Sequence, residues 1–384
     1  MRASIPVIDG NTTQAIQGFL KLLLESGKVE ALLVPMRTHS DTVTPALVTN
    51  PELLSNADPF APVLPVNGAT LAGKLSIREP RAKIGLVLRA CELRALVELT
   101  KMKQASLENL VLISLDCAGA YSVPEFQRRS SAIGAGEELW PELFRAAAED
   151  PTSPKGDLRQ ACQICEHPVY DSPDITIELL GTDYQHQLSL SLTEEWLACL
   201  GSAVERKAGG EGERAKTVQK LVDARIEQRD EEFRNIRQRL GDGSASDKSG
   251  SQSETIAGVF AACIRCHNCM TVCPICYCKT CVFKSEIFDH EPMQYLHWAQ
   301  QKGAYRLPSD SMLFHMTRLN HMGLSCVGCG MCTEACPADL PVGTVFRAIA
   351  SNLQQTFDYA PGRSVEEPLP LITFNADEWN EVGE

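Results

Sequence analysis

Two stretches of the chain repeat one cysteine pattern: Cys263-Ile-Arg-Cys266-His-Asn-Cys269-Met-Thr-Val-Cys273-Pro274 and Cys326-Val-Gly-Cys329-Gly-Met-Cys332-Thr-Glu-Ala-Cys336-Pro337. The shared spacing, C-x2-C-x2-C-x3-C-P, is typical of proteins that hold two 4Fe–4S clusters. Three cysteines surround one cluster, and the cysteine before proline ligates the other. We therefore predict one cluster on Cys263, Cys266, Cys269 and Cys336. A second cluster is predicted on Cys273, Cys326, Cys329 and Cys332.

Two other metal chemistries share part of this pattern. Zinc sites also use C-x2-C pairs, but zinc requires neither the third cysteine nor the cysteine before proline. Cys263-x-x-Cys266-His267 matches the attachment pattern of haem c, which would leave Cys269 and Cys273 without a role. Iron–sulfur clusters are therefore the preferred interpretation.

Composition limits the classes of function that the chain can have. It has 384 residues, 16 cysteines and a formal net charge of -13. This number of cysteines favours metal or redox work in a reducing compartment. The acidic balance disfavours nucleic-acid binding, and no apolar run is long enough to span a membrane. The N-terminal residues lack the apolar core of a signal peptide, so we expect a cytoplasmic protein.

The chain divides into three parts by composition. Residues 1–200 contain short apolar runs, at 30–36, 84–88, 110–115 and 175–180, that alternate with helical patterns. This alternation predicts an α/β domain with a mostly parallel sheet and flanking helices. Residues 201–254 hold a charged helix or helical hairpin and, at 241–254, a flexible linker. Residues 255–384 are expected to form a mainly helical two-cluster ferredoxin domain with an extended tail.

The first domain contains a second, weaker group of cysteines. Cys91 and Cys117 each follow a predicted strand, where ligands collect in α/β sheets, and Cys162-Gln-Ile-Cys165 comes later. Four cysteines can hold a third 4Fe–4S cluster. An equally weighted alternative is buried cysteines plus a zinc or redox pair at Cys162 and Cys165.

Some cysteines and functional motifs remain without a clear assignment. Cys276, Cys278 and Cys281 are interpreted either as metal ligands or as reduced thiols near a cluster, and Cys199 has no assigned role. The chain contains no G-x-G-x-x-G dinucleotide motif and no evident nucleophile–base arrangement. The catalytic residues therefore stay unknown, as fits a protein whose cofactors carry the chemistry.

These motifs resemble the β-subunit family of F-420-reducing hydrogenase and formate dehydrogenase. The similar segments are a helix, glycine and strand at 19–34, a strand followed by cysteine at 88–96, a strand ending in cysteine at 113–117, a C-x-x-C before an Asp-Ile strand at 162–177, and Cys-Pro-x-Cys-x-Cys at 273–278. The gap of about fifty residues between the two ferredoxin motifs resembles the helical ferredoxin module of succinate dehydrogenase and heterodisulfide reductase subunits. Leu-Arg-Ala-Cys91 departs from the family's Gly-Thr-Pro-Cys, and the segment after Gly181 is short.

The resemblance implies an electron-transfer β subunit with FAD beside the cluster of the first domain. Electrons would pass between a catalytic dehydrogenase or hydrogenase subunit, the clusters and FAD. The final carrier would be coenzyme F-420, NAD(P) or a protein. Arg89 and Arg94 are candidates to lie near a flavin phosphate or a reduced cluster, or else to form ordinary salt bridges. The rival functions are a flavin-free relay to a heterodisulfide-reductase-like partner and a zinc-dependent interaction protein.

Overall fold

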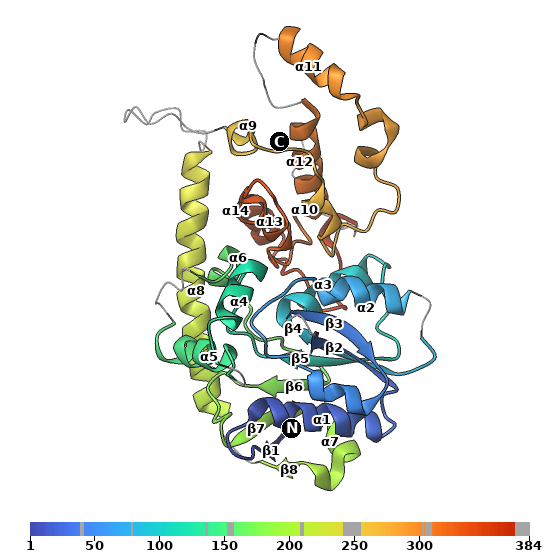
Figure 1. The fold of residues 1–384 in the computed structure, drawn as a ribbon, viewed down its shortest axis with the longest axis vertical. Helices are drawn as coiled ribbons and strands as arrows, with labels where there is room; N and C mark the ends of the chain where they lie inside the picture. The colour runs from blue at the N-terminus through green and yellow to red at the C-terminus, as the bar shows by residue number, and fades with distance from the viewer. Residues whose placement is uncertain are drawn as a thin grey trace, which may run out of the picture.

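The computed structural model describes residues 1–38, 42–77, 80–134, 137–151, 157–207, 211–240, 255–301, 303 and 309–372. The linker predicted at 241–254 and most of the predicted tail, residues 373–384, lie outside this description. The sheet with its helices occupies the lower half of Figure 1, and the cysteine-rich C-terminal part lies above it.

One mixed sheet forms the α/β part. Its strand order is β3-β2-β4-β5-β6-β7-β1-β8. The four central strands, β2, β4, β5 and β6, pair in parallel, and the outer pairs are antiparallel. The strands are β1 (Arg2–Pro6), β2 (Ala31–Arg37), β3 (Val43–Val48), β4 (Ile84–Arg89), β5 (Leu110–Leu115), β6 (Ile175–Glu178), β7 (Gln187–Leu192) and β8 (Glu205–Arg206).

Helices cover the sheet and build the C-terminal part. Those of the α/β part are α1 (Thr12–Glu25), α2 (Gly68–Ser76), α3 (Ala90–Lys101), α4 (Val123–Ser130), α5 (Trp140–Glu149), α6 (Gln160–Gln163) and α7 (Glu194–Leu200). The others are α8 (Glu211–Arg239), α9 (Ile256–Val259), α10 (Asn268–Thr271), α11 (Pro292–Gln301), α12 (Ser309–Met322), α13 (Met331–Glu334) and α14 (Val342–Thr356). The predicted class, an α/β domain followed by a mainly helical cysteine-rich domain, is confirmed.

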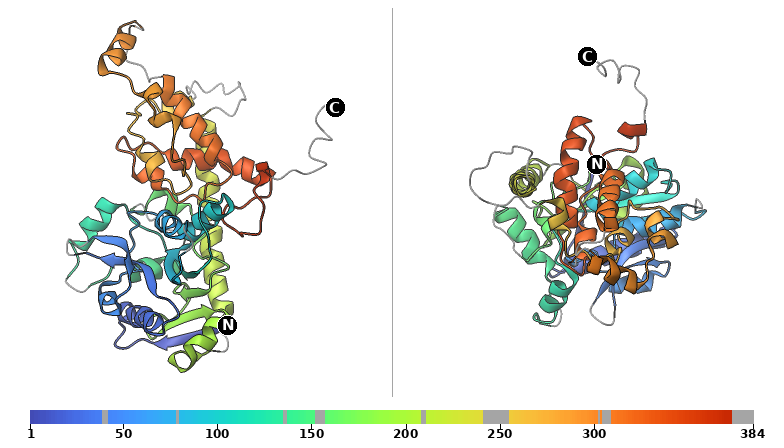
Figure 2. Two further views of the ribbon diagram at one scale, coloured as in Figure 1. Left: turned by 90° about the vertical axis from the view of Figure 1, so that its right-hand side faces the viewer. Right: turned by 90° about the horizontal axis from the view of Figure 1, so that it is seen from above.

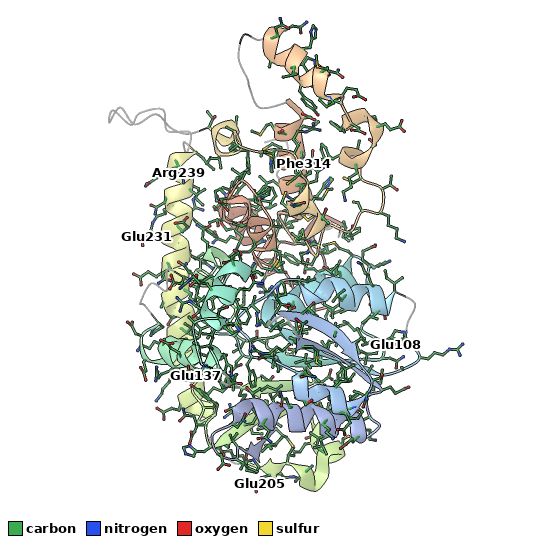
Figure 3. All side chains as sticks on the ribbon, viewed as in Figure 1. Glu108, Glu137, Glu205, Glu231, Arg239 and Phe314 are labelled. Carbon is green, nitrogen blue, oxygen red and sulfur yellow. The ribbon has the colours of Figure 1, made fainter. Side chains whose placement is uncertain are left out.

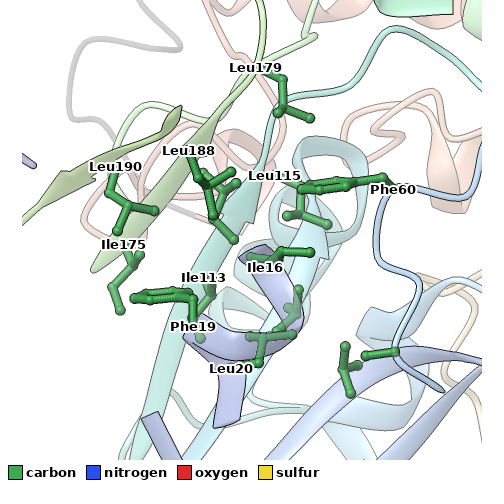
Figure 4. Close-up of a cluster of buried hydrophobic side chains, with 14 of the residues drawn as sticks. Ile16, Phe19, Leu20, Phe60, Ile113, Leu115, Ile175, Leu179, Leu188 and Leu190 are labelled. Atoms are coloured by element: carbon green, nitrogen blue, oxygen red, sulfur yellow. The ribbon is translucent and has the colours of Figure 1, made fainter. Parts of the chain in front are cut away.

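The main core lies between α1 and the sheet. The helical spacing of Ile16, Phe19 and Leu20 puts their side chains on one buried face of α1. Figure 4 shows them against Ile113 and other apolar side chains of β5, β6 and β7. Every residue of β4 and β5 is buried, as expected for central parallel strands covered on both faces.

Helix α8 joins the two parts of the molecule. The charged segment forms one helix of 29 residues, not a hairpin. At its start, Arg214 Nη2 lies 2.7 Å from Asp116 Oδ1, and the other carboxylate oxygen accepts hydrogen bonds from the Leu179 and Leu180 amides. Further along, α8 packs on α5, α6 and α14. Figure 1 and the left view of Figure 2 show it running upward from the sheet to the cysteine-rich part.

The segment after α14 packs on α3. The carboxylate of Glu98, which is fully buried, accepts hydrogen bonds from Tyr359 Oη at 2.6 Å and from the Gly362 amide at 2.8 Å. The buried Arg94 donates to the Pro361 and Val327 carbonyl oxygens at 2.8 and 3.2 Å. These contacts join segments more than 230 residues apart, so α3 positions the second ferredoxin motif against the sheet. Within the described residues, none of the helices combines the length and hydrophobicity that a membrane span requires.

The core under α1 yields a stability prediction. Ile16→Ala removes a side chain with no exposed surface, so we expect the free energy of unfolding to fall by about 2–5 kcal/mol. Urea unfolding followed by far-UV circular dichroism measures this loss. Ile8→Ala is the matched control, because Ile8 is 72% exposed and should change the same quantity by less than about 0.5 kcal/mol. Equal losses for the two variants would contradict the assigned core.

Candidate iron–sulfur sites

The four cysteines of the first domain line one pocket. Cys91 is the second residue of α3, which directly follows β4, Cys117 follows β5, and Cys162 and Cys165 lie on and just after α6. All four side chains border the same pocket. The structure therefore brings together the set that was grouped from sequence, which we call set 3.

Buried arginines surround set 3. Arg89, Arg159 and Arg225 line the pocket, and each is at most 7% exposed. Arg225 donates to the Ala118 carbonyl oxygen at 2.6 Å, but Nη1 of both Arg89 and Arg159 is buried without a hydrogen-bond partner in the described structure. Unpaired buried donors are costly. Their presence around four thiols fits an anionic, sulfur-rich group that would accept from them.

The second ferredoxin motif and one distant cysteine form set 2. Cys273, Cys326, Cys329 and Cys332 line a second pocket. Burial, together with the charge of Cys273, raises the pKa of the Cys329 thiol to about 12. Cys329 also lines the pocket of set 3, and its carbonyl oxygen accepts a hydrogen bond from Arg159 Nη2 at 2.9 Å. Sets 2 and 3 are therefore direct neighbours.

Set 1 contains Cys263, Cys266, Cys269 and Cys336. Burial raises the pKa of the Cys269 thiol to about 11 against the opposing charge of Arg318, and the charges of the other three cysteines act on the same thiol. Helices α10 and α13, which carry parts of the two motifs, pack on each other. Cys266 is exposed, so set 1 reaches the protein surface.

Helix α12 supplies polar contacts to set 1. Arg318, 3% exposed, donates from Nη1 to Cys269 Sγ at 3.1 Å and from Nη2 to the Cys269 carbonyl oxygen at 3.0 Å. His315 Nε2 lies 3.3 Å from Cys263 Sγ, and its ring stacks on Phe260 with centroids 3.9 Å apart. Burial and the charge of Arg318 lower the pKa of His315 to about 4, so the ring is neutral near pH 7.

Burial raises the pKa of two thiols of set 3. Burial, together with the charge of Glu166, raises the pKa of the Cys165 thiol to about 11, and burial also raises the pKa of Cys117. A reactive redox cysteine needs a pKa shift in the opposite direction from that of Cys165. Within the described residues, no group of three or more His, Cys, Asp or Glu side chains is arranged to hold a single metal ion.

Arg89 and Arg94 have separate environments. Neither forms an ordinary salt bridge among the described residues, so that interpretation was wrong. Arg89 donates to the Ala61 carbonyl oxygen and lies beside Cys91 in the pocket of set 3. Arg94 holds the loop at Val327 and lines a different, arginine-rich cavity.

The additional cysteines have individual settings. Cys276 is partly buried among apolar side chains near set 2, and Cys281 Sγ lies 3.6 Å from Met270 Sδ. Cys278 is exposed, and Cys199 packs on the main core from α7. These contacts resemble those of reduced thiols.

The sequence analysis did not identify the arginines that surround the cysteine sets. Arg159 could have been noticed because it lies three residues before Cys162. Arg225 and Arg318 lie on helices far along the chain from the cysteines they approach, and their local spacing carries no signal of this. Figure 3 draws all the side chains in the same view and labels Arg239 at the end of α8 and Phe314 in α12, the two helices that carry these arginines.

A large polar cavity lies at the carboxyl end of β2. It has a volume of about 610 Å³ and is lined by residues including Thr13, Gln17, Arg37, Ala61 and Ser130. Thr13 Oγ1 is buried without a hydrogen-bond partner in the described structure. Because Ala61 also accepts the hydrogen bond from Arg89, this strand-edge cavity is adjacent to set 3.

The contact between sets 2 and 3 yields a second prediction. Gly330 has φ +70°, and a Cβ there would overlap Ala161, which precedes Cys162. Gly330→Ala should therefore lower the free energy of unfolding by about 1–3 kcal/mol more than its control. The control is Gly10→Ala, which has φ +71° but open space around it, and isolates the backbone cost of about 1–2 kcal/mol. Urea unfolding measures both, and equal losses would rule out close packing of the two loops.

Comparison with known proteins gives full-length relatives. No protein-family model matches the chain. The F-420-dependent formate dehydrogenase subunit beta of Methanocaldococcus jannaschii is 24% identical over 94% of this chain and 94% of its own length. The F-420-dependent formate dehydrogenase 1 subunit beta of Methanococcus maripaludis is 23% identical over 97% of this chain and 96% of its own.

A solved structure is also similar. A chain of the F-420-reducing NiFe hydrogenase complex from Methanosarcina barkeri covers 61% of this chain and 92% of its own length, with 11% identity and a TM-score of 0.46. The resemblance indicated by the cysteine motifs is confirmed by the two curated relatives. Over nearly its whole length, the chain resembles the β subunits of F-420-dependent formate dehydrogenases.

Proposed function

We propose that the protein is the electron-transfer β subunit of a cytoplasmic formate dehydrogenase or hydrogenase type of complex. It would carry three 4Fe–4S clusters, on sets 1, 2 and 3, together with FAD. The observation that carries the proposal is the continuity of the cysteine sets. Sets 1 and 2 exchange a cysteine between their motifs, and Cys329 of set 2 borders the pocket of set 3. The full-length similarity to formate dehydrogenase β subunits supports it.

The positions of the two end sets, set 1 and set 3, indicate where partners and small molecules would bind. Set 1 reaches the surface at Cys266, and set 3 lies at the carboxyl edge of the sheet. A redox partner would therefore dock at the set 1 end, and small molecules would enter at the sheet edge, where ligands bind in α/β folds. The partner in this proposal is a catalytic dehydrogenase or hydrogenase subunit. The cytoplasm suits sixteen cysteines without disulfide bonds.

The strand-edge cavity is the place for FAD in this proposal. Its volume of about 610 Å³ suits a large organic cofactor, and the buried, unpaired Thr13 hydroxyl points to a polar ligand. Thr13, Gln17 and Ser130 would bind the flavin, and Arg89 would lie between it and set 3. When bound, FAD would supply conversion between single electrons and a two-electron hydride transfer. The hydride carrier would be F-420 or NAD(P), and a protein acceptor is the alternative.

Cofactor content tests this function directly. Protein purified without oxygen should contain about 12 iron atoms per chain and about one acid-releasable FAD. Cys91→Ser should lower the iron content by about four atoms per chain, because it removes a ligand of set 3. Cys199→Ser is the control and should keep all the iron, since Cys199 lies outside the three sets.

The possible results separate the rival functions. Full iron without flavin, also after reconstitution with FAD, would leave a flavin-free relay to a heterodisulfide-reductase-like partner. Zinc in place of iron would contradict both. Far-UV circular dichroism identifies a variant that is merely unfolded, and Cys165→Ser provides an independent test of set 3.

The contact of Arg318 with Cys269 predicts a redox effect. A hydrogen bond from a cation stabilises the extra electron of a reduced cluster, so Arg318→Met should lower the reduction potential of the set 1 cluster by about 60–130 mV. Arg318→Lys should recover much of the shift because it keeps the charge. Lys279→Met, an exposed lysine near Cys278, is the control and should have little effect. Potentiometric titration followed by electron paramagnetic resonance checks all three, and an unchanged potential in Arg318→Met would contradict the assigned role.

A further inference from the structure

A second large cavity lies between α8, α14 and the segment after α14. Its volume is about 500 Å³, which is in the range of ligand-binding pockets. Figure 1 shows α8 beside α14, and the two helices pack on each other. The cavity borders Cys326 of set 2 and also Glu166 and His167, which follow Cys165 of set 3. It therefore borders set 2 directly, shares His167 with the pocket of set 3, and is separate from the strand-edge cavity.

The charge of this cavity is opposite to that of the whole chain. Six arginines line it: Arg94, Arg229, Arg234, Arg237, Arg347 and Arg363. The lining acids are Glu166, Asp230 and Asp358, and the chain as a whole has a net charge of -13. A concentration of positive charge in an acidic protein focuses the electrostatic field on one cleft and attracts anions.

Some of the six arginines are used by neighbouring groups. Arg347 Nη2 lies 2.7 Å from both carboxylate oxygens of Glu166, and Arg229 Nη1 is 3.3 Å from one of them. Arg229 also pairs with Asp230 at 2.8 Å, and Arg363 pairs with Glu367. The arginines that remain for a ligand are therefore Arg94, Arg234 and Arg237.

These three arginines retain donor capacity toward the cavity. Arg94 donates from Nε and Nη1 to backbone oxygens, and its Nη2 has no hydrogen bond within the described residues. Arg237 donates from Nη1 to the Ala348 carbonyl oxygen. Arg234, three residues before it on the same face of α8, has no hydrogen bond or ion pair in the described part of the chain. Planar guanidinium groups match phosphate and carboxylate oxygens in geometry and charge.

We infer that this arginine-lined cavity binds a small polyanion, a molecule with at least two phosphate or carboxylate groups, between cysteine sets 2 and 3. The site is distinct from the proposed FAD site. If the clusters are present as proposed, a bound polyanion opposes the addition of an electron beside it. The ligand therefore binds more weakly to the reduced protein, and its binding lowers the reduction potential of the adjacent cluster.

Isothermal titration calorimetry tests the site. The full-length protein, purified without oxygen, is titrated with pyrophosphate and, separately, with citrate. At least one probe should bind, with one site per chain. The probe with the higher affinity shows whether the site prefers phosphate or carboxylate groups. Arg234→Gln/Arg237→Gln should weaken binding about tenfold or more. Lys216→Gln/Lys220→Gln changes the charge of the same helix equally at exposed positions outside the cavity and should leave binding within about twofold.

Two outcomes would overturn the site: no binding of either probe at millimolar concentration, or equal weakening in the two double variants. Oxidised protein is used for this comparison, so its result does not depend on electron transfer. The redox coupling is tested separately, with protein that is reduced and then freed of reductant. The reduced protein should bind the probe about three- to tenfold more weakly than the oxidised protein. Equal affinity of the oxidised and reduced proteins would overturn the coupling. Neither failure would remove the flavin and iron expected from the proposed function.

Discussion

The close contact between the second ferredoxin motif and the pocket at the sheet edge is the constraint on which the rest of the structure depends. Gly330 leaves no room for a side chain against Ala161, and Arg159 donates to the Cys329 carbonyl oxygen at 2.9 Å. Electron transfer between cofactors weakens steeply with separation, so a relay requires neighbouring sites. The glycine at this position lets two loops from different parts of the chain approach closely.

Two further devices maintain this contact. Helix α8 is anchored to the sheet by Arg214 and Asp116 and packs on α14 further along. Burial raises the pKa of Asp116 to about 6 despite the opposing charge of Arg214, so the ion pair is fully formed only above that pH. On the other side, Glu98 of α3 binds Tyr359 and the Gly362 amide. The cysteine-rich part is thus held against the sheet from two sides.

Cysteine sets 1 and 3 share one electrostatic feature: buried arginine side chains lie beside their sulfur atoms. Arg89, Arg159 and Arg225 border set 3, and Arg318 contacts Cys269 of set 1. Without an anionic group, several of their donors stay unpaired, and burial disfavours the thiolate form of the cysteines around them. Binding of a negatively charged cluster would satisfy both at once, since thiolate ligands and buried guanidinium groups compensate each other.

The sequence by itself determined the class of fold and the central strands, and it predicted the division of eight cysteines between two ferredoxin clusters, while the third set stayed open against a zinc or redox pair. These follow from local pattern: apolar runs of strand length, and ferredoxin spacing that determines which cysteines can face one cluster. The tertiary structure alone decided that Arg94 serves a cavity separate from set 3 and that sets 2 and 3 are neighbours. It also brought Arg225 and Arg318 to cysteines 60 and 49 residues away in the chain. Such contacts depend on how helices pack across the whole molecule. The periodicity of one segment predicts which of its faces is buried, but it does not predict which distant segment packs there.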